Sequence, residues 1–443
     1  MKKLSILILI NIIFAQTSKK ANVTIYKDGT ALVKQEIVWD NIPKGKSIIK
    51  YDDIPKSIQK DTPFISIENV QVLNQKFVEK IFSTNNYFSS KKGDYITVKL
   101  RNEKAVSGNL LEISSNLLTI QSKYSVRSFN RDNIEYIETK DNISAPNFSP
   151  YLQWEIKNNK AGKVKASLVY KLGNVSWDAI YRLTTNGQTE GELVVEGVIF
   201  NNSSKDYFNA NINLVEGIIN KSKPKQTNNY SEMAMSRSVV QKNTPAELGD
   251  YYIYSTGSIQ NFTSRENITV GIYGPLNVNY EKVYVFENFE RQKKDEPLII
   301  EYTLSNTEKD GLGIVLPAGK VDIYTNSNKG GFEFIGSDNI GQVPKGESSK
   351  IQAGYAFDIT GKRKVINYDR QRKSEEAVIE VALNNSKSET ASVKIIEHIS
   401  GDWVIKDPSH NYIKEDASTI HFLIDVEPGK KEFITYTYRK EWK

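Results

Sequence analysis

Apolar and polar residues alternate along most of this chain, which is the pattern of half-buried β-strands. The run Val23–Tyr26 is followed by Asp28-Gly29 and then by a second run, Thr30–Val38. Asp-Gly between two such runs predicts a tight hairpin, because glycine adopts a positive φ at little cost. Similar runs recur to the end of the chain and predict an all-β protein.

One stretch has helical spacing instead. Leu73, Phe77 and Ile81 lie four residues apart, with Val78 and Phe82 beside them. Residues at this spacing share one face of an α-helix. The stretch is short, so it predicts only a brief helix.

The strand pattern divides the chain into regions. Residues 21–90 form an N-terminal β region that we expect to pair with the main sandwich. Residues 92–139 contain five short strands with tight turns, which predict an inserted small SH3/Sm-like barrel. Residues 150–365 predict the main β-sandwich, interrupted by a polar, mobile surface loop at 220–248. Residues 374–443, with turns every 8–12 residues, predict an immunoglobulin-like sandwich without its disulfide. The expected fold is therefore a multidomain β-sandwich protein.

The N-terminus has the pattern of a secretory signal peptide over residues 1–15. Lys2 and Lys3 precede the apolar run Leu4–Phe14, and Ala15 is a small residue at a plausible cleavage point. The apolar run has about 11 residues, whereas a membrane-spanning helix needs about 20. An uncleaved N-terminal anchor is the alternative. No later segment is long and apolar enough to cross a membrane, so we expect a periplasmic or extracellular protein.

Composition narrows the chemistry. The 443 residues include no cysteine and three histidines, and the formal net charge is +6. The lack of cysteine excludes a disulfide scaffold, thiolate zinc, iron–sulfur ligation and a cysteine nucleophile. The charge is too small and too dispersed to indicate a nucleic-acid partner.

The three histidines, His398, His410 and His421, could together hold zinc. Their spacings match no local ligand motif, so solvated surface histidines are the expectation and no metal is assigned. Gly311-Leu312-Gly313 begins like a dinucleotide fingerprint but lacks the third glycine. Pro317–Lys320 ends like a phosphate loop but lacks the required first glycine and the hydroxyl residue after the lysine. Turns between strands explain both motifs, and no cofactor is expected.

No catalytic residue is assigned. A G-x-S-x-G serine-hydrolase elbow does not occur in the sequence. Asp52-Asp53 and Glu375-Glu376 are adjacent pairs, so on a strand their side chains point to opposite faces. A carboxylate pair assembled from distant strands, as in glycosidases, stays open at this stage.

Two features allow a ligand contact. The basic run Lys362–Lys364, with Arg370, Arg372 and Lys373, is expected to be a solvated linker; contact with an anionic glycan or lipid headgroup is the alternative. Trp177, with Asn174, Asp178 and Tyr181 nearby, could stack on a sugar ring. The competing interpretation is a tryptophan packed between sheets.

Several segments together resemble the bacterial domain of unknown function 4139 family, which is related to the C-terminal part of mucoidy-inhibitor-A-like proteins. They keep the family's order: VTIYKDGTALVKQEIVWDNIPKGKSIIKYDDIP (Val23–Pro55), SLVYKLGNVSWDAIYRLTTN (Ser167–Asn186), NNSSKDYFNANINLVEG (Asn201–Gly217), ELGDYYIY (Glu247–Tyr254), NTEKDGLGIVLPAGKVDIY (Asn306–Tyr324) and YAFDIT (Tyr355–Thr360). The resemblance implies a secreted, all-β envelope protein and brings no established site residues. The chain lacks the long coiled-coil part of some mucoidy-inhibitor-like relatives, so their partners are not assumed.

These observations predict an exported, non-enzymatic protein that acts as a protein-interaction or structural module of the cell envelope. An envelope or extracellular protein is the expected partner, bound through an exposed strand edge. The alternative is a glycan-binding protein or a glycan-processing enzyme at the cell surface.

Overall fold

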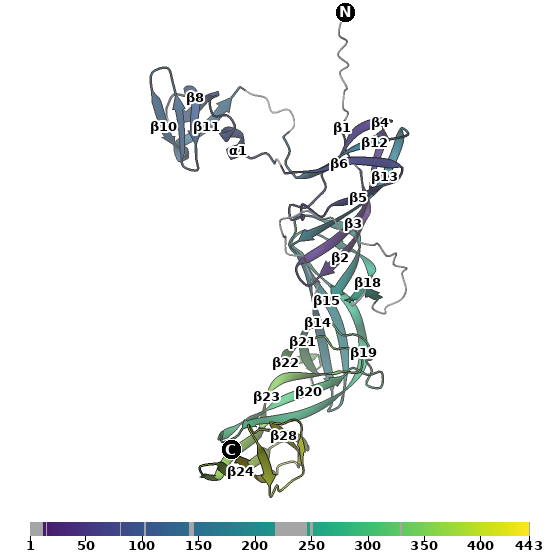
Figure 1. Cartoon of the computed structure of the whole chain (residues 1–443), viewed down its shortest axis with the longest axis vertical. Helices are drawn as coiled ribbons and strands as arrows, with labels where there is room; N and C mark the ends of the chain where they lie inside the picture. The colour runs from purple at the N-terminus through teal and green to yellow at the C-terminus, as the bar shows by residue number, and fades with distance from the viewer. Residues whose placement is uncertain are drawn as a thin grey trace, which may run out of the picture. The chain divides into compact units, whose positions relative to one another are not determined.

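The computed structural model describes residues 12–14, 16–79, 81–101, 103–140, 146–217, 246–248, 251–327 and 330–442. Almost all of these residues lie in strands or turns, as the alternating pattern predicts (Figure 1). Within these ranges no helix has the length and apolar character to cross a membrane. Two predictions fall largely outside the description. Of the expected signal peptide, only Ile12–Phe14 is described, and of the expected loop at 220–248, only Ala246–Leu248.

The chain forms two compact units. The first comprises Met1–Asn22, Leu32–Gly173 and Ser203–Asn209, and the second comprises Val23–Ala31, Asn174–Asn202 and Ala210–Lys443. The strands β2 (Gln16–Tyr26), β3 (Thr30–Ile42) and β16 (Tyr207–Glu216) contribute residues to both units.

The first unit contains three groups of strands. A four-stranded sheet has the order β1 (Ile12–Phe14), β4 (Gly45–Tyr51), β12 (Tyr151–Asn158) and β6 (Val70–Val78). A five-stranded sheet has the order β10 (Val126–Asn130), β9 (Leu117–Gln121), β8 (Val106–Ile113), β7 (Tyr95–Leu100) and β11 (Ile134–Thr139). The third group is β3 (Thr30–Ile42), β13 (Gly162–Gly173) and β5 (Phe64–Ile67), again as neighbours in that order.

The five-stranded sheet covers the predicted barrel region. It has its own apolar core, made of Ile96, Val98, Leu110, Leu118 and Ile120. The short helix α1 (Thr84–Ser89) lies against β8, and the 3-10 helix η1 (Arg131–Asn133) joins β10 to β11 (Figure 1). In the described ladders, β10 pairs only with β9 and β11 only with β7. The five predicted strands are present, and their order runs from β10 to β11 without closing into a complete barrel.

The predicted helix around Leu73 and Phe77 is wrong. These residues lie in β6, which pairs antiparallel with β12, so that Phe77 lies opposite Leu152. The helix of this region is α1, which begins at Thr84. The four-residue spacing of Leu73 and Phe77 does not indicate a helix, because hydrogen bonding to β12 holds this segment as a strand.

The second unit is built around one large sheet. Its order is β22 (Phe332–Ile340), β21 (Gly319–Asn326), β14 (Val175–Asn186), β15 (Glu190–Asn201), β19 (Glu266–Phe289), β20 (Lys294–Ser305), β23 (Ser348–Arg370), β24 (Ser374–Asn385), β29 (Lys431–Glu441) and β26 (Trp403–Lys406). A second group has the order β17 (Ala246–Leu248), β18 (Tyr251–Phe262), β16 (Tyr207–Glu216) and β2 (Gln16–Tyr26). The Asp28-Gly29 hairpin is confirmed: β2 ends at Tyr26, β3 begins at Thr30, and Gly29 has a φ of 82°.

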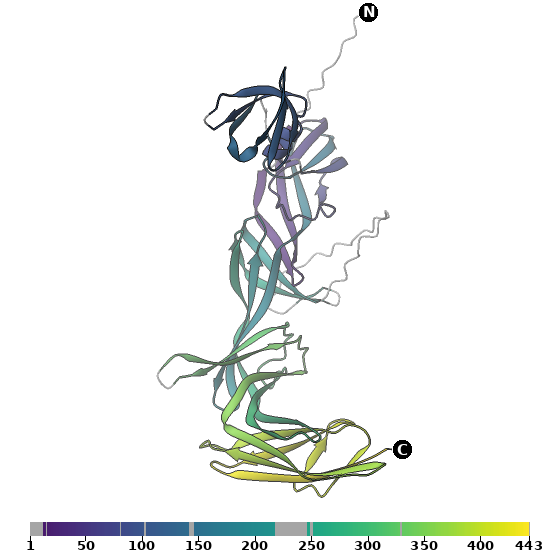
Figure 2. The same cartoon turned by 90° about the vertical axis from the view of Figure 1, so that its left-hand side faces the viewer.

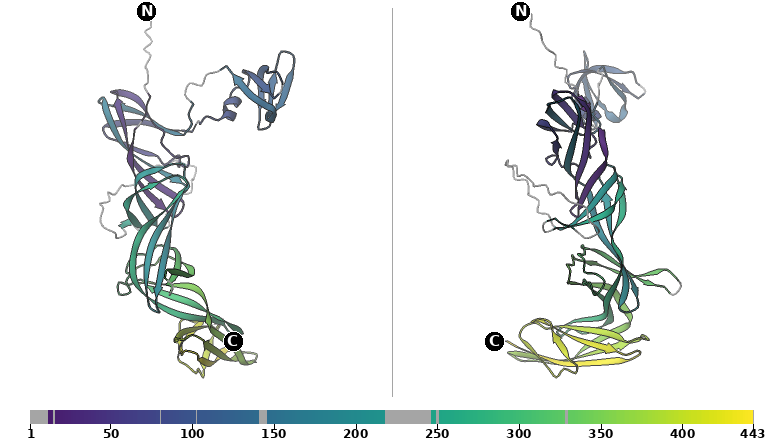
Figure 3. Two further views of the ribbon diagram at one scale, coloured as in Figure 1. Left: turned by 180° about the vertical axis from the view of Figure 1, so that it is seen from behind. Right: turned by 90° about the vertical axis from the view of Figure 1, so that its right-hand side faces the viewer.

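The C-terminal sandwich consists of β24, β29 and β26 together with β25 (Ala391–His398), β28 (Thr419–Val426) and β27 (Tyr412–Lys414). Figures 2 and 3 show its strands in yellow near the marked C-terminus. Its core also contains residues from β19, β20 and β23, namely Tyr284, Phe286, Leu298, Ala356 and Ile359. β25 pairs parallel with the end of β19, Tyr284 opposite Val393. The sandwich thus extends to strands that precede the expected boundary at residue 374.

Candidate functional site

Trp177 is fully buried, and this excludes the alternative in which its ring stacks on a sugar. Its exposed fraction is 0%, and its indole Nε1 donates a hydrogen bond to the carbonyl oxygen of Val215 at 3.1 Å. Tyr181 lies four residues further along β14, on the same face of the strand, and is also fully buried. The interpretation as a tryptophan packed inside the β structure is the correct one.

A buried carboxylate lies beside Trp177. Glu216 is only 4% exposed, and its Oε2 lies 3.0 Å from Nζ of Lys27. Gln342 Nε2 donates to Glu216 Oε1 at 2.7 Å, and the backbone N–H of Ala318 donates to the same oxygen at 3.4 Å. Lys27 Nζ also lies 4.9 Å from the Trp177 ring centroid. These five residues, the Glu216 cluster, come from distant parts of the sequence, so no local motif could reveal them.

Three tyrosine hydroxyls hold the segment next to Ala318. Tyr181 donates to the carbonyl oxygen of Pro317 at 2.5 Å, and Tyr254 and Tyr273 donate to that of Val315 at 3.3 and 3.4 Å. Burial raises the pKa of all three tyrosines above the ordinary value. The hydroxyls therefore stay protonated and act as donors.

The same contacts rule against an anion site at Pro317–Lys320. The backbone N–H of Ala318 binds the carboxylate of Glu216, and Lys320 Nζ lies 2.8 Å from Asp322 Oδ1. A phosphate at this position would face a buried negative charge. The Glu216 cluster and its tyrosines fix a turn in place.

The Gly311-Leu312-Gly313 motif is likewise a turn. Gly311 and Gly313 have φ angles of 83° and 78°, which glycine adopts without strain. Asn306 organises this turn: its Nδ2 donates to the carbonyl oxygens of Ile314, Val343 and Pro344, and its Oδ1 accepts from the N–H groups of Gly313 and Ile314. The interpretation as a turn between strands is thus confirmed.

The three histidines do not come together. His398 Nε2 lies 2.7 Å from Glu287 Oε1, and His421 Nδ1 lies 2.7 Å from Glu415 Oε1. His410 Nε2 lies 3.6 Å from Glu432 Oε1. Burial lowers the pKa of His421, and Glu415 opposes this effect. Across the described part of the chain, no group of three or more histidine and acidic side chains is arranged to hold a metal ion.

The basic residues from Lys362 to Arg370 are part of a strand, so the predicted solvated linker is wrong for them; Arg372 and Lys373 lie exposed in the bend that follows. Lys362, Arg363 and Lys364 lie within β23, which continues to Arg370. Lys362 pairs with Asp295 and Lys364 with Glu380 on the surface. Arg363 is 1% exposed and points into the core of the C-terminal sandwich.

Arg363 forms a buried ion pair with Glu397, which is 0% exposed. Its Nε lies 3.1 Å from both carboxylate oxygens, and its Nη2 donates to Oε2 at 2.9 Å. The hydroxyl of Tyr436 lies 3.2 Å from Nη2, and Asn288 Nδ2 donates to Glu397 Oε1 at 3.2 Å. Arg363 also donates to the backbone carbonyls of Glu290 and Gln292. Burial alone would lower the pKa of Arg363, but Glu397 outweighs this and raises it, so the guanidinium stays charged.

The two glutamates of the Glu375-Glu376 pair have different partners. Glu375 is buried and lies near Lys440 and the hydroxyl of Tyr368, whereas Glu376 pairs with Lys406. β24 alternates buried and half-exposed residues, as the prediction of opposite faces requires. Asp53 pairs with Lys205 inside the first unit.

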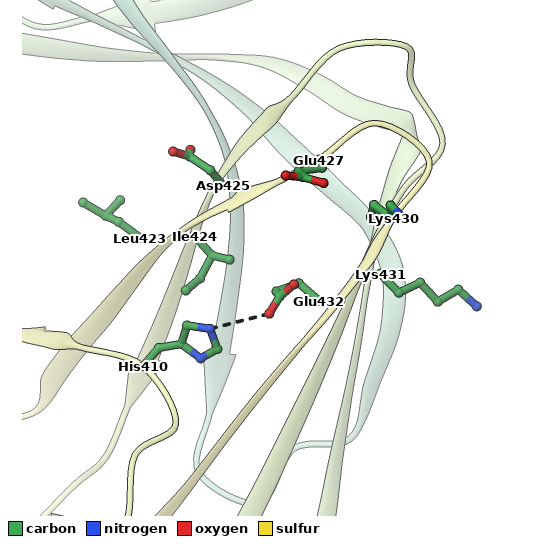
Figure 4. A pocket seen from close by; sticks show the side chains of 8 residues that line it. All are labelled: His410, Leu423, Ile424, Asp425, Glu427, Lys430, Lys431 and Glu432. Atoms are coloured by element: carbon green, nitrogen blue, oxygen red, sulfur yellow. Dashed lines mark ion pairs between the residues drawn. The ribbon is translucent and has the colours of Figure 1, made fainter.

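One surface depression of about 440 Å³ lies in the C-terminal sandwich (Figure 4). Its lining includes the His410–Glu432 pair and side chains of both charge signs from β28 and from the turn into β29: Asp425, Glu427, Lys430 and Lys431. Leu423 and Ile424 are the apolar lining residues. Small-molecule pockets are mostly apolar, with a few placed polar groups. This mixed, charged lining selects neither an apolar ligand nor one sign of charge.

The four-stranded sheet of the first unit presents an exposed edge. β6 is its outermost strand and pairs only with β12 among the described ladders. Val72 and Leu73 on β6 are 36% and 39% exposed. Asn74 and Gln75 bind Glu155 and Trp154, which fix the strand on β12. β6 therefore offers an ordered backbone edge with apolar side chains.

No protein-family model matches the chain, and a search of curated proteins finds no match either. The resemblance to the domain of unknown function 4139 family therefore stays a prediction.

Proposed function

We propose that this chain is an exported, non-enzymatic protein-interaction or structural module of the cell envelope. The exposed edge of β6 is the observation that carries the proposal. A strand edge with unpaired N–H and C=O groups is a template for pairing with a second chain. The apolar side chains Val72 and Leu73 beside that edge add area that a partner can bury.

Two further features support the proposal. The pattern of residues 1–15 predicts an export signal, which agrees with an envelope location. The buried ionisable groups Glu216, Arg363 and Glu397 have protein partners, as groups that stabilise a fold do.

The test places a photo-crosslinking amino acid at Leu73 in cells that make the full chain. Tyr124, an aromatic residue that is 87% exposed in the turn between β9 and β10, takes the same amino acid as a matched control. We expect Leu73 to capture one envelope protein reproducibly and Tyr124 to capture none of it. Identical capture from both positions, or no capture from either, would contradict the proposal. Sequencing of the purified protein tests export, because the processed chain is expected to begin near Gln16.

Glycan binding stays a second candidate, although Trp177 is no longer part of it. Tyr355 and Phe357 are 67% and 90% exposed, and as alternate residues of β23 they share one face. Exposed aromatic rings on one face can stack on sugar rings. We expect Tyr355→Ala with Phe357→Ala to abolish retention by cell-surface polysaccharide if this function is real. Phe433→Ala, at a 53% exposed position elsewhere, is the control.

A further inference from the structure

The edge of the four-stranded sheet opposite β6 is covered by residues of the expected signal peptide. β1 pairs in parallel with β4, with Ile12 opposite Ile48, Ile13 opposite Ile49 and Phe14 opposite Lys50. β12 occupies the other side of β4 from Gly45 to Tyr51. Cleavage after Ala15 would remove β1 and leave Ile48, Ile49 and Lys50 without a neighbouring strand on that side of β4.

We propose that the edge of β4, uncovered by removal of residues 1–15, accepts an extended apolar segment of an envelope protein as a parallel strand. This inference rests on the proposed function, because it requires export with cleavage of the leader. The pairing of Ile12–Phe14 with β4 shows the direction and register that such a segment would adopt.

The side chains of β4 define the chemistry of the donor segment. Ser47, Ile49 and Tyr51 are buried, at 4%, 0% and 1% exposure, while Ile48 and Lys50 are half-buried on the other face. Neighbouring residues in a parallel ladder point to the same face. The donor residue opposite Ile49 therefore contacts the apolar interior and must be apolar. The donor residue opposite Ile48 lies on the outer face and tolerates a polar side chain.

Ser47 adds a second requirement. Its Oγ is buried and has no hydrogen-bond partner among the described residues. In the register of β1, the donor residue that faces Ser47 is two positions before the one that faces Ile49. A serine, threonine or asparagine at that donor position could bond to Ser47 Oγ. The expected donor sequence is thus a small polar residue, any residue, and then an apolar residue.

The outer face of β4 fits a partner of low charge. Lys46 Nζ lies 3.7 Å from Glu155 Oε1, and Lys50 Nζ lies 4.5 Å from the Tyr151 ring centroid. Both lysines on this face of β4 thus already have partners within the sheet. Backbone pairing and apolar contact, more than ion pairing, would hold the donor.

The experiment uses the processed protein purified from the envelope fraction and a fluorescent peptide that carries Asn11–Ala15 between soluble flanks. Fluorescence anisotropy measures the dissociation constant. We expect saturable binding. Ile13→Asp in the peptide should weaken binding by about tenfold or more, because it places a carboxylate over an apolar face. Ile12→Asp changes the residue that pairs with the half-buried Ile48; it is the matched control and should change binding by less than about threefold.

Two protein variants locate the site. Ser47→Ala removes the buried hydroxyl that the polar donor residue would bond, and should weaken peptide binding by about threefold or more. Leu73→Ala truncates an exposed side chain on β6, the opposite edge, and should leave binding unchanged. Thermal melting of both variants confirms that they fold.

Several outcomes would overturn the inference. They are a lack of saturable binding, equal loss with Ile12→Asp and Ile13→Asp, or a loss with Leu73→Ala in place of Ser47→Ala. Capture of an envelope protein at Leu73 without peptide binding would refute the β4 edge alone. A purified chain that still begins at Met1 and captures no partner would refute both this inference and the proposed function.

Discussion

The C-terminal sandwich and the four-stranded sheet of the first unit end in different kinds of strand. The outermost strands of the sandwich, β26 and β27, have four and three residues. Lys406 on β26 pairs with Glu376 at 3.1 Å, and Lys414 on β27 lies 4.3 Å from the Trp403 ring centroid. β6 has nine residues, VQVLNQKFV, of which only Lys76 is charged.

This difference indicates where an intermolecular contact should be sought. Edges this short offer few backbone groups to another chain, and pairing there would also require burial of a lysine. A long edge with apolar side chains lacks that protection. The edges of the sandwich are thus poor sites for pairing with another chain, whereas β6 can pair with a strand of another molecule.

The interiors of the two regions differ as well. The sandwich buries the ion pair of Arg363 and Glu397 with all its hydrogen-bond partners. The four-stranded sheet buries Trp154 edge-on against Trp39, with ring centroids 6.0 Å apart, and Trp154 Nε1 donates to Gln75 Oε1 at 2.6 Å. A buried charge depends on one partner, whereas apolar packing is shared among many contacts.

The largest expected effect comes from Arg363→Met. It leaves the carboxylate of Glu397 buried without its partner and should lower the free energy of unfolding by about 3–5 kcal/mol. Chemical denaturation of the purified chain measures it. Adding Glu397→Leu should recover most of the loss, because it removes the unpaired charge. Lys362→Met, which breaks a surface pair on the same strand, should cost less than about 1 kcal/mol. Equal losses from Arg363→Met and Lys362→Met would contradict the comparison.

A smaller effect is expected from Trp154→Phe in the first unit. The change removes buried ring volume and the hydrogen bond to Gln75, and should cost about 1–2 kcal/mol. Trp442, which is 38% exposed and donates to the carbonyl oxygen of Arg372, is the control. Trp442→Phe should cost less than about 0.5 kcal/mol. If the two variants denature alike, packing of Trp154 does not stabilise this sheet.

A pH-dependent effect is expected at Glu290. Partial burial would raise the pKa of this carboxyl, but hydrogen bonds from Lys440 and Ser400 outweigh burial and lower the pKa from 4.5 to about 2. The folded carboxylate therefore resists protonation, and its stabilisation is present above pH 4.5 and is lost as the pH falls toward 2. Glu290→Gln should flatten the stability profile between these values, measured by denaturation at each pH. Glu103→Gln, at an exposed position, should leave the profile unchanged; a wild-type profile in Glu290→Gln would refute the assignment.

The smallest effect on stability is expected from Leu73→Lys. The position is exposed on β6, so the free energy of unfolding should change by less than about 0.5 kcal/mol. Association should change much more, because the new charge blocks the edge. Light scattering or partner capture measures this. Val404→Lys on β26, where the edge already carries a lysine, is the control and should leave association unchanged. An equal effect of both variants would contradict the view that β6, and not β26, is the edge that binds a partner.

Regular alternation made the strands predictable where one face is buried. In β3, Ala31, Val33, Ile37 and Trp39 are fully buried and alternate with half-buried or exposed residues. β6 has no buried face, so its sequence carries no such period, and chance spacing of Leu73 and Phe77 suggested a helix. The strand exists because β12 supplies the hydrogen-bond partners, which are far away in sequence.

The buried polar groups could not be predicted. Arg363 lies between two lysines in a sequence that has the composition of a solvated linker. Glu397 is 34 residues away, and nothing local distinguishes it from the surface glutamates. Lys27 and Glu216 are separated even further along the chain. Such pairs become visible only when the strands that carry them are placed together.

By itself, the sequence determined that this protein is built of strands, and it excluded chemistry that requires cysteine. Local periodicity and turn residues are enough for that, because the pleat of a strand and the φ of a glycine are local properties. The tertiary structure alone decided that Trp177 is buried, that Arg363 is paired, that the five-stranded sheet is open, and which strands form edges. These outcomes depend on pairing between distant segments, whose energies are non-local.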